Sequence, residues 1–384
     1  MNRSVITSAV RTPVGKFGGG LRSCAAVDLG AVAIREAVDR AGVPADEIDH
    51  VVMGHVVQAG TGQISSRQAA VAAGLPKEVP AITLNNVCLS SLTAIAYADQ
   101  LIRLGEIGTA VAGGMESMTN APYLLRKARW GARLGAADVV DAMIYDGLWS
   151  TFTGQHMGES SDEVNDELGI AREEQDEWAA RSHRRAAEAR DSGRSAEEMV
   201  ALEVLEQDEG IRADTTLESL AELPPAFAPG GTITAGNASQ LSDGAAAVTV
   251  MSPERAHELG IEPLAEIVAS GMCAERFAYL HTVPAIALQQ ALGKAGLEAG
   301  DLGVVEINEA FASVALHATR MLGLSEDIVN LNGNSVALGH ALGSTGARMA
   351  VTLVHEMRRR GVEYGAATLC GGGGQGYALI LRAA

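Results

Sequence analysis

The fold of this chain is organised around one stretch, Asn85-Asn86-Val87-Cys88-Leu89-Ser90-Ser91-Leu92-Thr93-Ala94-Ile95. A strand-like apolar run, residues 81–84, precedes it, and a helical pattern follows as far as Gly105. Cys88 is therefore predicted at a strand-to-helix turn, where unpaired N–H groups and the helix dipole lower the pKa of a thiol. Cys88 is either a nucleophile or an ordinary buried cysteine; the local pattern leaves both open.

The size and charge of the chain limit what it can be. Its 384 residues predict two or three domains, and 47% hydrophobic with 20% charged residues is a normal globular balance. The net charge of −18 disfavours binding to nucleic acid or to an anionic membrane surface.

The cysteine pattern and the N-terminal residues indicate the cellular compartment and whether a metal site is expected. Cys24, Cys88, Cys273 and Cys370 show no C-x-x-C spacing, so no zinc site is expected, and sparse cysteines favour a reducing compartment. No signal-peptide pattern precedes the first strand, and no apolar run reaches about 18 residues. We expect a cytoplasmic protein without a membrane span or a bound metal.

Strand and helix patterns alternate at both ends of the chain. They predict strands at 4–9, 51–57, 81–84 and 109–112 and helices at 25–41, 65–73 and 92–104, which favours an α/β fold with a largely parallel sheet. Residues 118–242 differ, with long polar helices and Pro/Gly loops that look like an insertion. Basic clusters in the insertion (Arg126, Lys127, Arg129 and Arg133; Arg181, Arg184 and Arg185) are expected on solvated helix faces, with a phosphate-bearing ligand as the alternative.

An internal repeat indicates a duplicated half. Residues 41–52 resemble residues 295–306, and Val111-Ala112-Gly113-Gly114 resembles Leu369-Cys370-Gly371-Gly372, in the same order. Two similar halves that meet bring corresponding loops together, and active sites favour such junctions.

Three C-terminal stretches carry polar and glycine-rich patterns: residues 305–312, 330–348 and 368–376. The first includes Asn308, the second His340 and the third Cys370. Taken one at a time, each has a structural explanation, as a buried histidine, a core cysteine or a tight glycine turn.

Together with Cys88, these stretches resemble the thiolase family over nearly the whole chain. The matching motifs are Arg11-Thr12-Pro13, residues 87–90, 112–118 and 234–239, Asn308-Glu309-Ala310-Phe311, Gly339-His340 and residues 370–373. The resemblance implies a thiolase fold of two duplicated α/β halves in five layers (αβαβα) with an inserted loop domain. The expected domains are residues 1–117 with about 243–268, the inserted loop domain 118–242, and the second half, 269–384.

The resemblance also implies a chemistry. Cys88 takes the acyl group from a coenzyme A thioester, His340 accepts its proton, and Cys370 exchanges a proton with the substrate carbon. One thioester oxygen is bound by His340 and a water held by Asn308, the other by the N–H groups of Cys88 and Gly372. The pantetheine, acyl and adenine ends of coenzyme A are assigned to Leu148, His156, Met157, Arg212, Phe227, Ser239 and Phe311.

We therefore expect an acetyl-CoA C-acetyltransferase of fatty acid metabolism, with coenzyme A as substrate, no permanently bound cofactor, and a homodimer or homotetramer. The alternatives are a longer-chain 3-ketoacyl-CoA thiolase and a thiolase-like lipid-carrier protein with weak catalysis. A decarboxylating ketoacyl synthase is disfavoured, because it needs a second histidine in place of Asn308. The chain departs from the family at Ser91 (usually Gly), Asn334 (Gly), Ala341 (Pro) and the stretch 278–282, which leaves acyl chain length open.

Overall fold

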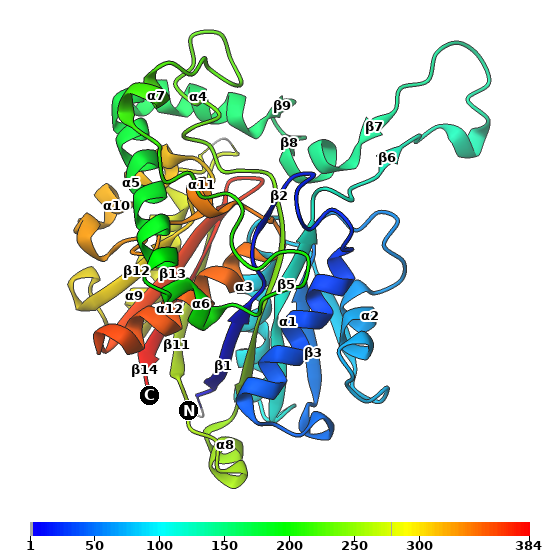
Figure 1. Ribbon diagram of the computed structural model, residues 1–384, viewed down its shortest axis with the longest axis vertical. Coiled ribbons are helices and arrows are strands. Elements are labelled where there is room, and N and C mark those ends of the chain that lie inside the picture. Colours follow the sequence, from blue (N-terminus) through cyan, green and yellow to red (C-terminus); the bar gives the residue numbers. More distant parts are fainter. Residues whose placement is uncertain (1–2, 278) are drawn as a thin grey trace.

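The computed structural model describes residues 3–277 and 279–384, and its centre is one mixed sheet (Figure 1). The strand order is β12-β13-β14-β11-β1-β10-β5-β3-β4, with β2 paired to β10. The strands are β1 Val5–Arg11, β2 Gly15–Lys16, β3 His50–Gly54, β4 Ala81–Leu84, β5 Thr109–Ser117, β10 Ser242–Met251, β11 Ala265–Ala274, β12 Leu302–Ile307, β13 Tyr364–Gly371 and β14 Gln375–Ala383.

The prediction of a largely parallel sheet is wrong. Only β3 with β4 and β5, and β12 with β13, pair in parallel, and the other neighbours are antiparallel. The physical reason is visible in β13 and β14, which are joined by a three-residue turn, Gly372-Gly373-Gly374. A turn that short can join only antiparallel strands, and φ of +79° and +68° at Gly373 and Gly374 favours glycine there.

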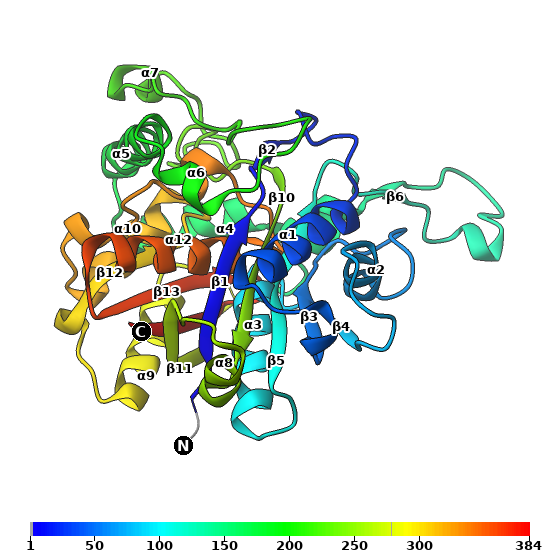
Figure 2. The ribbon, with the colours of Figure 1, turned by 60° about the horizontal axis from the view of Figure 1, so that its bottom comes forward.

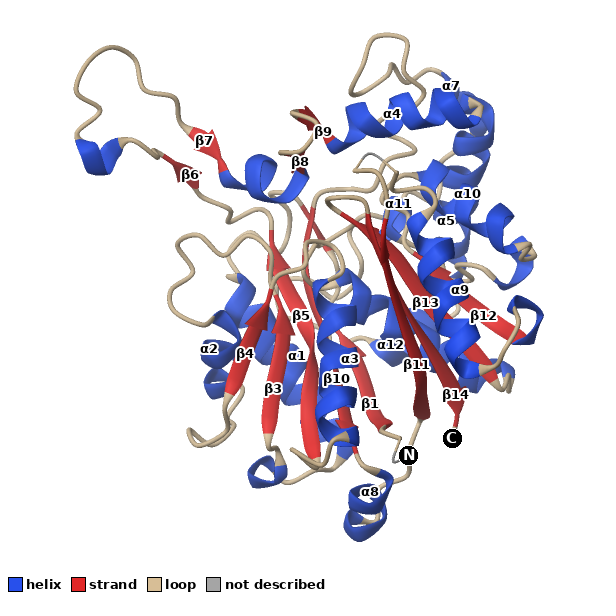
Figure 3. Ribbon diagram, turned by 180° about the vertical axis from the view of Figure 1, so that it is seen from behind, coloured by secondary structure: helices blue, strands red, loops and turns tan. Residues whose placement is uncertain are grey.

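Helices make five layers with the two halves of the sheet, which confirms the predicted α/β architecture. Helices α1 (Ala26–Ala41) and α2 (Ser65–Ala72) cover the outer face of the first half, and α9 (Val283–Ala295) with α10 (Ala312–Leu322) covers the outer face of the second. Helices α3 (Ser90–Arg103) and α12 (Thr345–Arg360) contact each other and strands of both halves. Figures 2 and 3 show α1 and α2 with the strands of the first half, α2 beside β3 and β4, and both away from α9 and β12.

The middle layer is the largest core. Leu92 and Ile95 of α3 and Val351 and Leu353 of α12 are fully buried with residues of both sheet halves. A helix that is buried nearly all round needs apolar or small side chains on every face. At Gly346 of α12 there is no room for any side chain, because a Cβ there would lie 2.7 Å from the backbone N of Leu92.

Ser91 connects these two central helices. Its Oγ accepts a hydrogen bond from the N–H of Ala347, at 2.9 Å, in the first turn of α12. Ser344, at the N-cap of α12, makes no capping bond with its own side chain. Ser91 therefore caps α12 from the neighbouring helix, and its hydroxymethyl group is a stabilising feature.

Ser91→Ala is expected to lower the free energy of unfolding by about 1 kcal/mol, the usual loss when a helix cap is removed. Urea unfolding followed by circular dichroism measures this. Ser252→Ala is the matched variant. It removes the N-cap of the peripheral helix α8 (Pro253–Leu259), whose hydroxyl accepts from the N–H of Arg255 in the same helix. An unchanged unfolding midpoint for Ser91→Ala would mean that the bond to Ala347 contributes no net stability.

The segment between β5 and β10 carries short elements and an extended arm. The arm holds β6 and β7 and extends away from the rest of the chain in Figures 1 and 3. The assignment of residues 118–242 to a separate inserted domain remains a prediction. The elements are β6 Tyr123–Leu124, η2 Ala128–Trp130, β7 Val140–Asp141, η3 Met143–Leu148, β8 Trp149–Ser150, β9 Gln155–His156, α4 Met157–Leu168, α5 Arg172–Asp191, α6 Arg194–Glu198 and α7 Leu217–Ala221.

The remaining short helices are η1 Ala45–Glu47, α8 Pro253–Leu259, η4 Ala299–Asp301, η5 Glu326–Ile328 and α11 Ser335–Leu338. In the part of the chain that the structure describes, no helix is long and apolar enough to cross a membrane.

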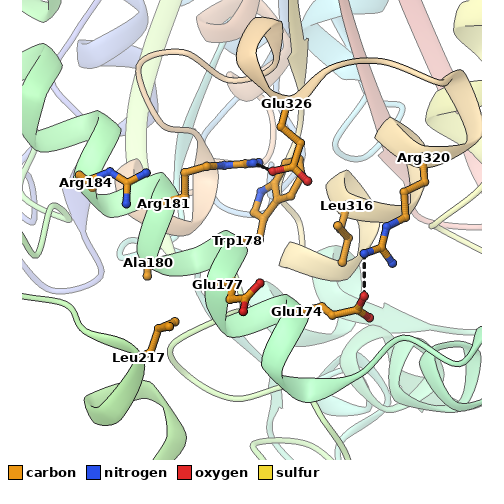
Figure 4. Close-up of a pocket in the computed structure, with 10 residues that line it drawn as sticks. All are labelled: Glu174, Glu177, Trp178, Ala180, Arg181, Arg184, Leu217, Leu316, Arg320 and Glu326. Atoms are coloured by element: carbon orange, nitrogen blue, oxygen red, sulfur yellow. Dashed lines mark hydrogen bonds and ion pairs between the residues drawn. The ribbon is translucent and has the colours of Figure 1, made fainter.

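The second basic cluster is only partly solvated. Arg181 stacks on the Trp178 ring at 3.8 Å and pairs with Glu326, and Arg185 donates to the carbonyls of Val329 and Glu326. Arg184 is exposed, as predicted. Figure 4 shows Arg181 pointing to Glu326 across a cavity of about 370 Å³ whose charged side chains largely pair with one another. This cluster therefore joins α5 to the second half.

Candidate active site

A strained turn places Cys88 inside the protein. Val87, between β4 and α3, has a φ of +48°, which is uncommon for a β-branched residue. Its N–H is held by Asn85 Oδ1 at 3.0 Å and its carbonyl by the Ser90 hydroxyl at 2.6 Å. The turn directs Cys88 into the protein, where it is 2% exposed.

Burial has the largest effect on the pKa of the Cys88 thiol. It raises the pKa of Cys88 to about 12, although the N–H groups of Cys88 itself and of Gly372 oppose the rise. The expectation of a lowered pKa is therefore wrong, because loss of hydration outweighs the helix N-terminus. At neutral pH the Cys88 thiol is protonated, so its use as a nucleophile requires a base.

The hairpin between β13 and β14 brings a second thiol and an N–H donor to Cys88. Cys370, near the end of β13, is buried, and burial and then Cys88 raise its pKa. Gly372 in the turn has its N–H close enough to the Cys88 sulfur to stabilise a thiolate. Gly371 permits this approach, because a Cβ there would lie 2.6 Å from Leu89 Cγ.

His340 lies in the loop between α11 and α12, where its backbone N–H donates to the carbonyl of Gln240. Its Nδ1 lies 2.8 Å from Thr345 Oγ1, and the Thr345 hydroxyl donates to the carbonyl of Ala341 at 2.9 Å. Since a hydroxyl has one proton, Nδ1–H must donate to Thr345, and Nε2 carries the lone pair. Burial, followed by Arg348, lowers the pKa of His340 to about 3, so the ring is a neutral base at Nε2.

Asn308 follows β12, and its N–H donates to the carbonyl of Thr368 in β13. Its Oδ1 accepts from the Ser335 hydroxyl at 2.6 Å. Asn308 Nδ2 and His340 Nε2 are both buried without a hydrogen-bond partner among the described residues. Buried polar atoms without a partner are rare and costly, so each calls for an explanation, such as a ligand or a water at that place.

A cavity of about 620 Å³ opens beside this centre. It is lined by Val87 and Gly372 from the two turns and by Trp149, Phe152 and Met157 from the inserted segment. A concave, largely aromatic and apolar wall of this size suits an organic ligand.

Most of the residues expected to bind coenzyme A lie around the two thiols. Leu148 packs in the cluster that contains Cys88, and Met157, Phe227 and Phe311 pack in the one that contains Cys370. His156 stacks on Phe227 with ring centroids 4.8 Å apart.

The other two expected ligand residues differ in burial. Ser239 is half-buried and its N–H donates to the carbonyl of Ala310, beside Phe311. Arg212 is exposed, and its backbone N–H donates to His183 Nδ1.

The altered stretch 278–282 lies partly near the same wall. Leu280 is buried in the cluster that contains Cys370. His281 is fully buried, with Nε2 2.8 Å from Asn165 Oδ1 and 3.1 Å from Ser313 Oγ. Ala278 lies outside the described residues.

Sequence reasoning missed Thr345, Glu116 and Ser335. Glu116 is buried, and its carboxylate accepts from the N–H groups of Val56, Val57 and Gly343, with His55 Nε2 at 3.4 Å. It thereby holds the Gly343 turn, three residues after His340. The only sequence signal for Glu116 was its place in the motif 112–118. A carboxylate that accepts hydrogen bonds from backbone N–H groups has no sequence pattern of its own. Among the described residues no three His, Cys, Asp or Glu side chains are grouped to hold a metal ion.

Comparison with known proteins gives consistent matches over the whole chain. Residues 4–254 match the family described as Thiolase, N-terminal domain, and residues 261–383 match Thiolase, C-terminal domain. The chain is 50% identical to the "Probable acetyl-CoA acetyltransferase" of Mycobacterium leprae (100% of both chains) and 45% identical to the acetyl-CoA acetyltransferase of Escherichia coli (100% of this chain, 99% of the other). The crystal structure of the Bacillus anthracis acetyl-CoA acetyltransferase superposes with a TM-score of 0.98 at 42% identity, covering 100% of this chain and 99% of the other.

Proposed function

The chain belongs to the thiolase family, and from that premise we propose that it is an acetyl-CoA C-acetyltransferase, which interconverts acetoacetyl-CoA and coenzyme A with two molecules of acetyl-CoA. The observation that carries the proposal is the approach of Cys88, Cys370 and the Gly372 N–H in one buried centre. Two thiols with separate tasks are what Claisen chemistry on a thioester needs, and a lipid-carrier protein has no use for the pair.

We propose a ping-pong route. Cys88 gives its proton to His340 Nε2 and attacks the 3-oxo carbon of acetoacetyl-CoA. The bond between C2 and C3 then breaks, and Cys370 gives its proton to C2, which releases acetyl-CoA and leaves acetyl-Cys88. Coenzyme A passes its thiol proton to Cys370 and attacks the acetyl group, and His340 returns the proton to Cys88.

The oxyanions of this route need donors at two places. The N–H groups of Cys88 and Gly372 suit the oxygen of the acyl-Cys88 thioester, because Gly372 already lies at the sulfur. His340 Nε2, once protonated, and Asn308 Nδ2 with a water suit the oxygen of the second thioester, since both atoms are buried and have no partner in the described part of the chain. Donors of this kind are each worth about 2.7–4 kcal/mol in a comparable enzyme.

A longer-chain 3-ketoacyl-CoA thiolase of fatty acid degradation is the second candidate. The observation in its favour is the altered stretch, where Leu280 lies in the cluster around Cys370. Thiolysis rates for acetoacetyl-CoA, C6 and C10 3-oxoacyl-CoA at one coenzyme A concentration decide between the two. Highest kcat/KM for acetoacetyl-CoA supports the first proposal, highest kcat/KM for C6 or C10 supports the second, and no turnover by folded protein contradicts both.

The acid limb of the thiolysis pH profile is expected below pH 5. His340 accepts a proton only while it is neutral, so activity is lost as pH falls through its pKa, which burial lowers to about 3. A histidine with the ordinary pKa of 6.5 would cost about 25-fold in kcat/KM between pH 7 and pH 5. We expect less than about a twofold change there, measured in initial rates with circular dichroism to verify folding; a limb near pH 6.5 would contradict the proposed state of His340.

We also propose a cytoplasmic homodimer or homotetramer. Its four free cysteines suit a reducing compartment. The arm supports association, because Trp130 and Leu134 are 79% and 97% exposed and large apolar side chains gather at interfaces. Sedimentation of the protein and of a Trp130→Ser, Leu134→Ser variant separates dimer from tetramer.

A further inference from the structure

A line of buried polar side chains behind Asn308 takes no part in the route above. Ser335 and Asn334 begin α11, Arg348 is in α12 and Glu306 is in β12, and each is at most 3% exposed. Hydrogen bonds between buried polar groups are strengthened by the low local dielectric, so such a network can hold a side chain at its end in one orientation.

The hydrogen bonds along this line have a fixed direction. Arg348 has only donors, so its Nη2, 3.3 Å from Ser335 Oγ, makes that oxygen an acceptor. The single proton of the Ser335 hydroxyl then goes to its nearest acceptor, Asn308 Oδ1 at 2.6 Å, instead of Asn334 Oδ1 at 3.2 Å. The amide oxygen of Asn308 therefore faces Ser335, and its NH₂ group has no hydrogen-bond partner among residues 3–277 and 279–384.

Arg348 is itself held on two sides. Its Nη1 lies 3.5 Å from Glu306 Oε2, and its Nη2 donates to Asn334 Oδ1. Asn334 Nδ2 donates to the same Glu306 oxygen at 2.7 Å. Asn334 is one of the departures from the family pattern, where glycine offers no side chain for these bonds.

We propose that Ser335 is a positioning residue for Asn308: its hydroxyl, directed by Arg348 and Asn334, holds the Asn308 amide with Nδ2 toward the reacting thioester. This inference rests on the proposed function. Without the Ser335 hydroxyl, the amide of Asn308 can rotate and present Oδ1, an acceptor, where the oxyanion needs a donor. The loss then appears in the chemical step and little in substrate binding.

A double-mutant cycle tests this, with wild type, Ser335→Ala, Asn308→Ala and the double variant assayed for acetoacetyl-CoA thiolysis. We expect Asn308→Ala to lower kcat about 100-fold and Ser335→Ala about tenfold, with KM within about twofold. The double variant should match Asn308→Ala, because Ser335 acts only through Asn308. Ser8→Ala, which removes a buried hydroxyl bonded to Ala37 and Thr249, is the control and should keep wild-type kcat.

Two outcomes overturn the inference and leave the proposed function intact: kcat of Ser335→Ala within twofold of an active wild type, or a further tenfold loss in the double variant. If Ser335→Ala does not fold, Asn334→Gly replaces it in the same cycle. That variant should lower kcat alone and have no effect beside Asn308→Ala, and a multiplicative loss there overturns the inference as well. An inactive wild type contradicts the proposed function and this inference with it.

Discussion

Cys88→Ala is expected to lose both turnover and acyl-enzyme formation, whereas Cys370→Ala is expected to lose turnover and still become acetylated. The rate of thiolysis should fall about 10⁴-fold or more in each, the scale of removing a nucleophile or its partner. The two differ because, in transfer of an acetyl group from acetyl-CoA to Cys88, Cys370 only protonates the leaving coenzyme A thiolate, and water can replace it there. In cleavage of acetoacetyl-CoA the proton must reach carbon, where water is a poor substitute for the positioned thiol.

Intact-mass spectrometry after incubation with acetyl-CoA measures the difference. Wild type and Cys370→Ala should gain the mass of one acetyl group, and Cys88→Ala should gain none. Cys24→Ala is the matched control, since Cys24 is a half-buried free cysteine packed beside the outer core of the first half. Acetylation that persists in Cys88→Ala, or that disappears in Cys370→Ala, would contradict the division of labour.

Glu116→Ala is expected to lower the free energy of unfolding by about 3–5 kcal/mol, the scale of breaking a buried charged hydrogen-bond network. The variant leaves three buried N–H groups, of Val56, Val57 and Gly343, without an acceptor, and it opens a cavity beside His55. Glu116→Gln keeps one oxygen and should lose less, about 1–3 kcal/mol.

Guanidinium unfolding measures these losses, with Glu209→Ala as the matched control. Glu209 also accepts two backbone N–H bonds, from Lys16 and Gly20, but water can reach that loop, so about 1 kcal/mol or less is expected. An equal loss for Glu116→Ala and Glu209→Ala would show that burial adds nothing to this carboxylate. An equal loss for Glu116→Ala and Glu116→Gln would show that charge, and not the number of acceptors, determines the loss.

The hydrophobic periodicity of the sequence predicted the bounds of helices and strands correctly where a single residue ends the element. Strand β4 has the expected bounds, and α1 ends at Ala41 because Gly42 takes the left-handed conformation. Strand direction could not be derived in the same way, because β10 and β14 reach their partners after an insertion or a tight turn. Parallel pairing was inferred from alternation alone, which describes only the strands joined by helices.

The candidate active site likewise could be predicted from local sequence only in part. Cys88, His340, Asn308 and Cys370 were singled out from sequence, and their roles remain predictions. The pKa of Cys88 was predicted in the wrong direction, because a local pattern contains the helix N-terminus but not the distant residues that exclude water. Thr345 could not be predicted as a site residue either. Its effect on His340 depends on which acceptor receives its single hydroxyl proton, and that is a property of the folded structure.

The hairpin turn at Gly372 has a consequence for how the protein is made. Strands β3, β4 and β5, which pair with one another, and the turn at Cys88 can form early in synthesis, as N-terminal segments generally do. Yet His340, Cys370 and the Gly372 N–H belong to segments translated more than two hundred residues after Cys88. The nascent chain therefore carries Cys88 without its proposed base and without the residues that exclude water from it. The complete acyl-transfer centre exists only after the second half has been synthesised and has docked.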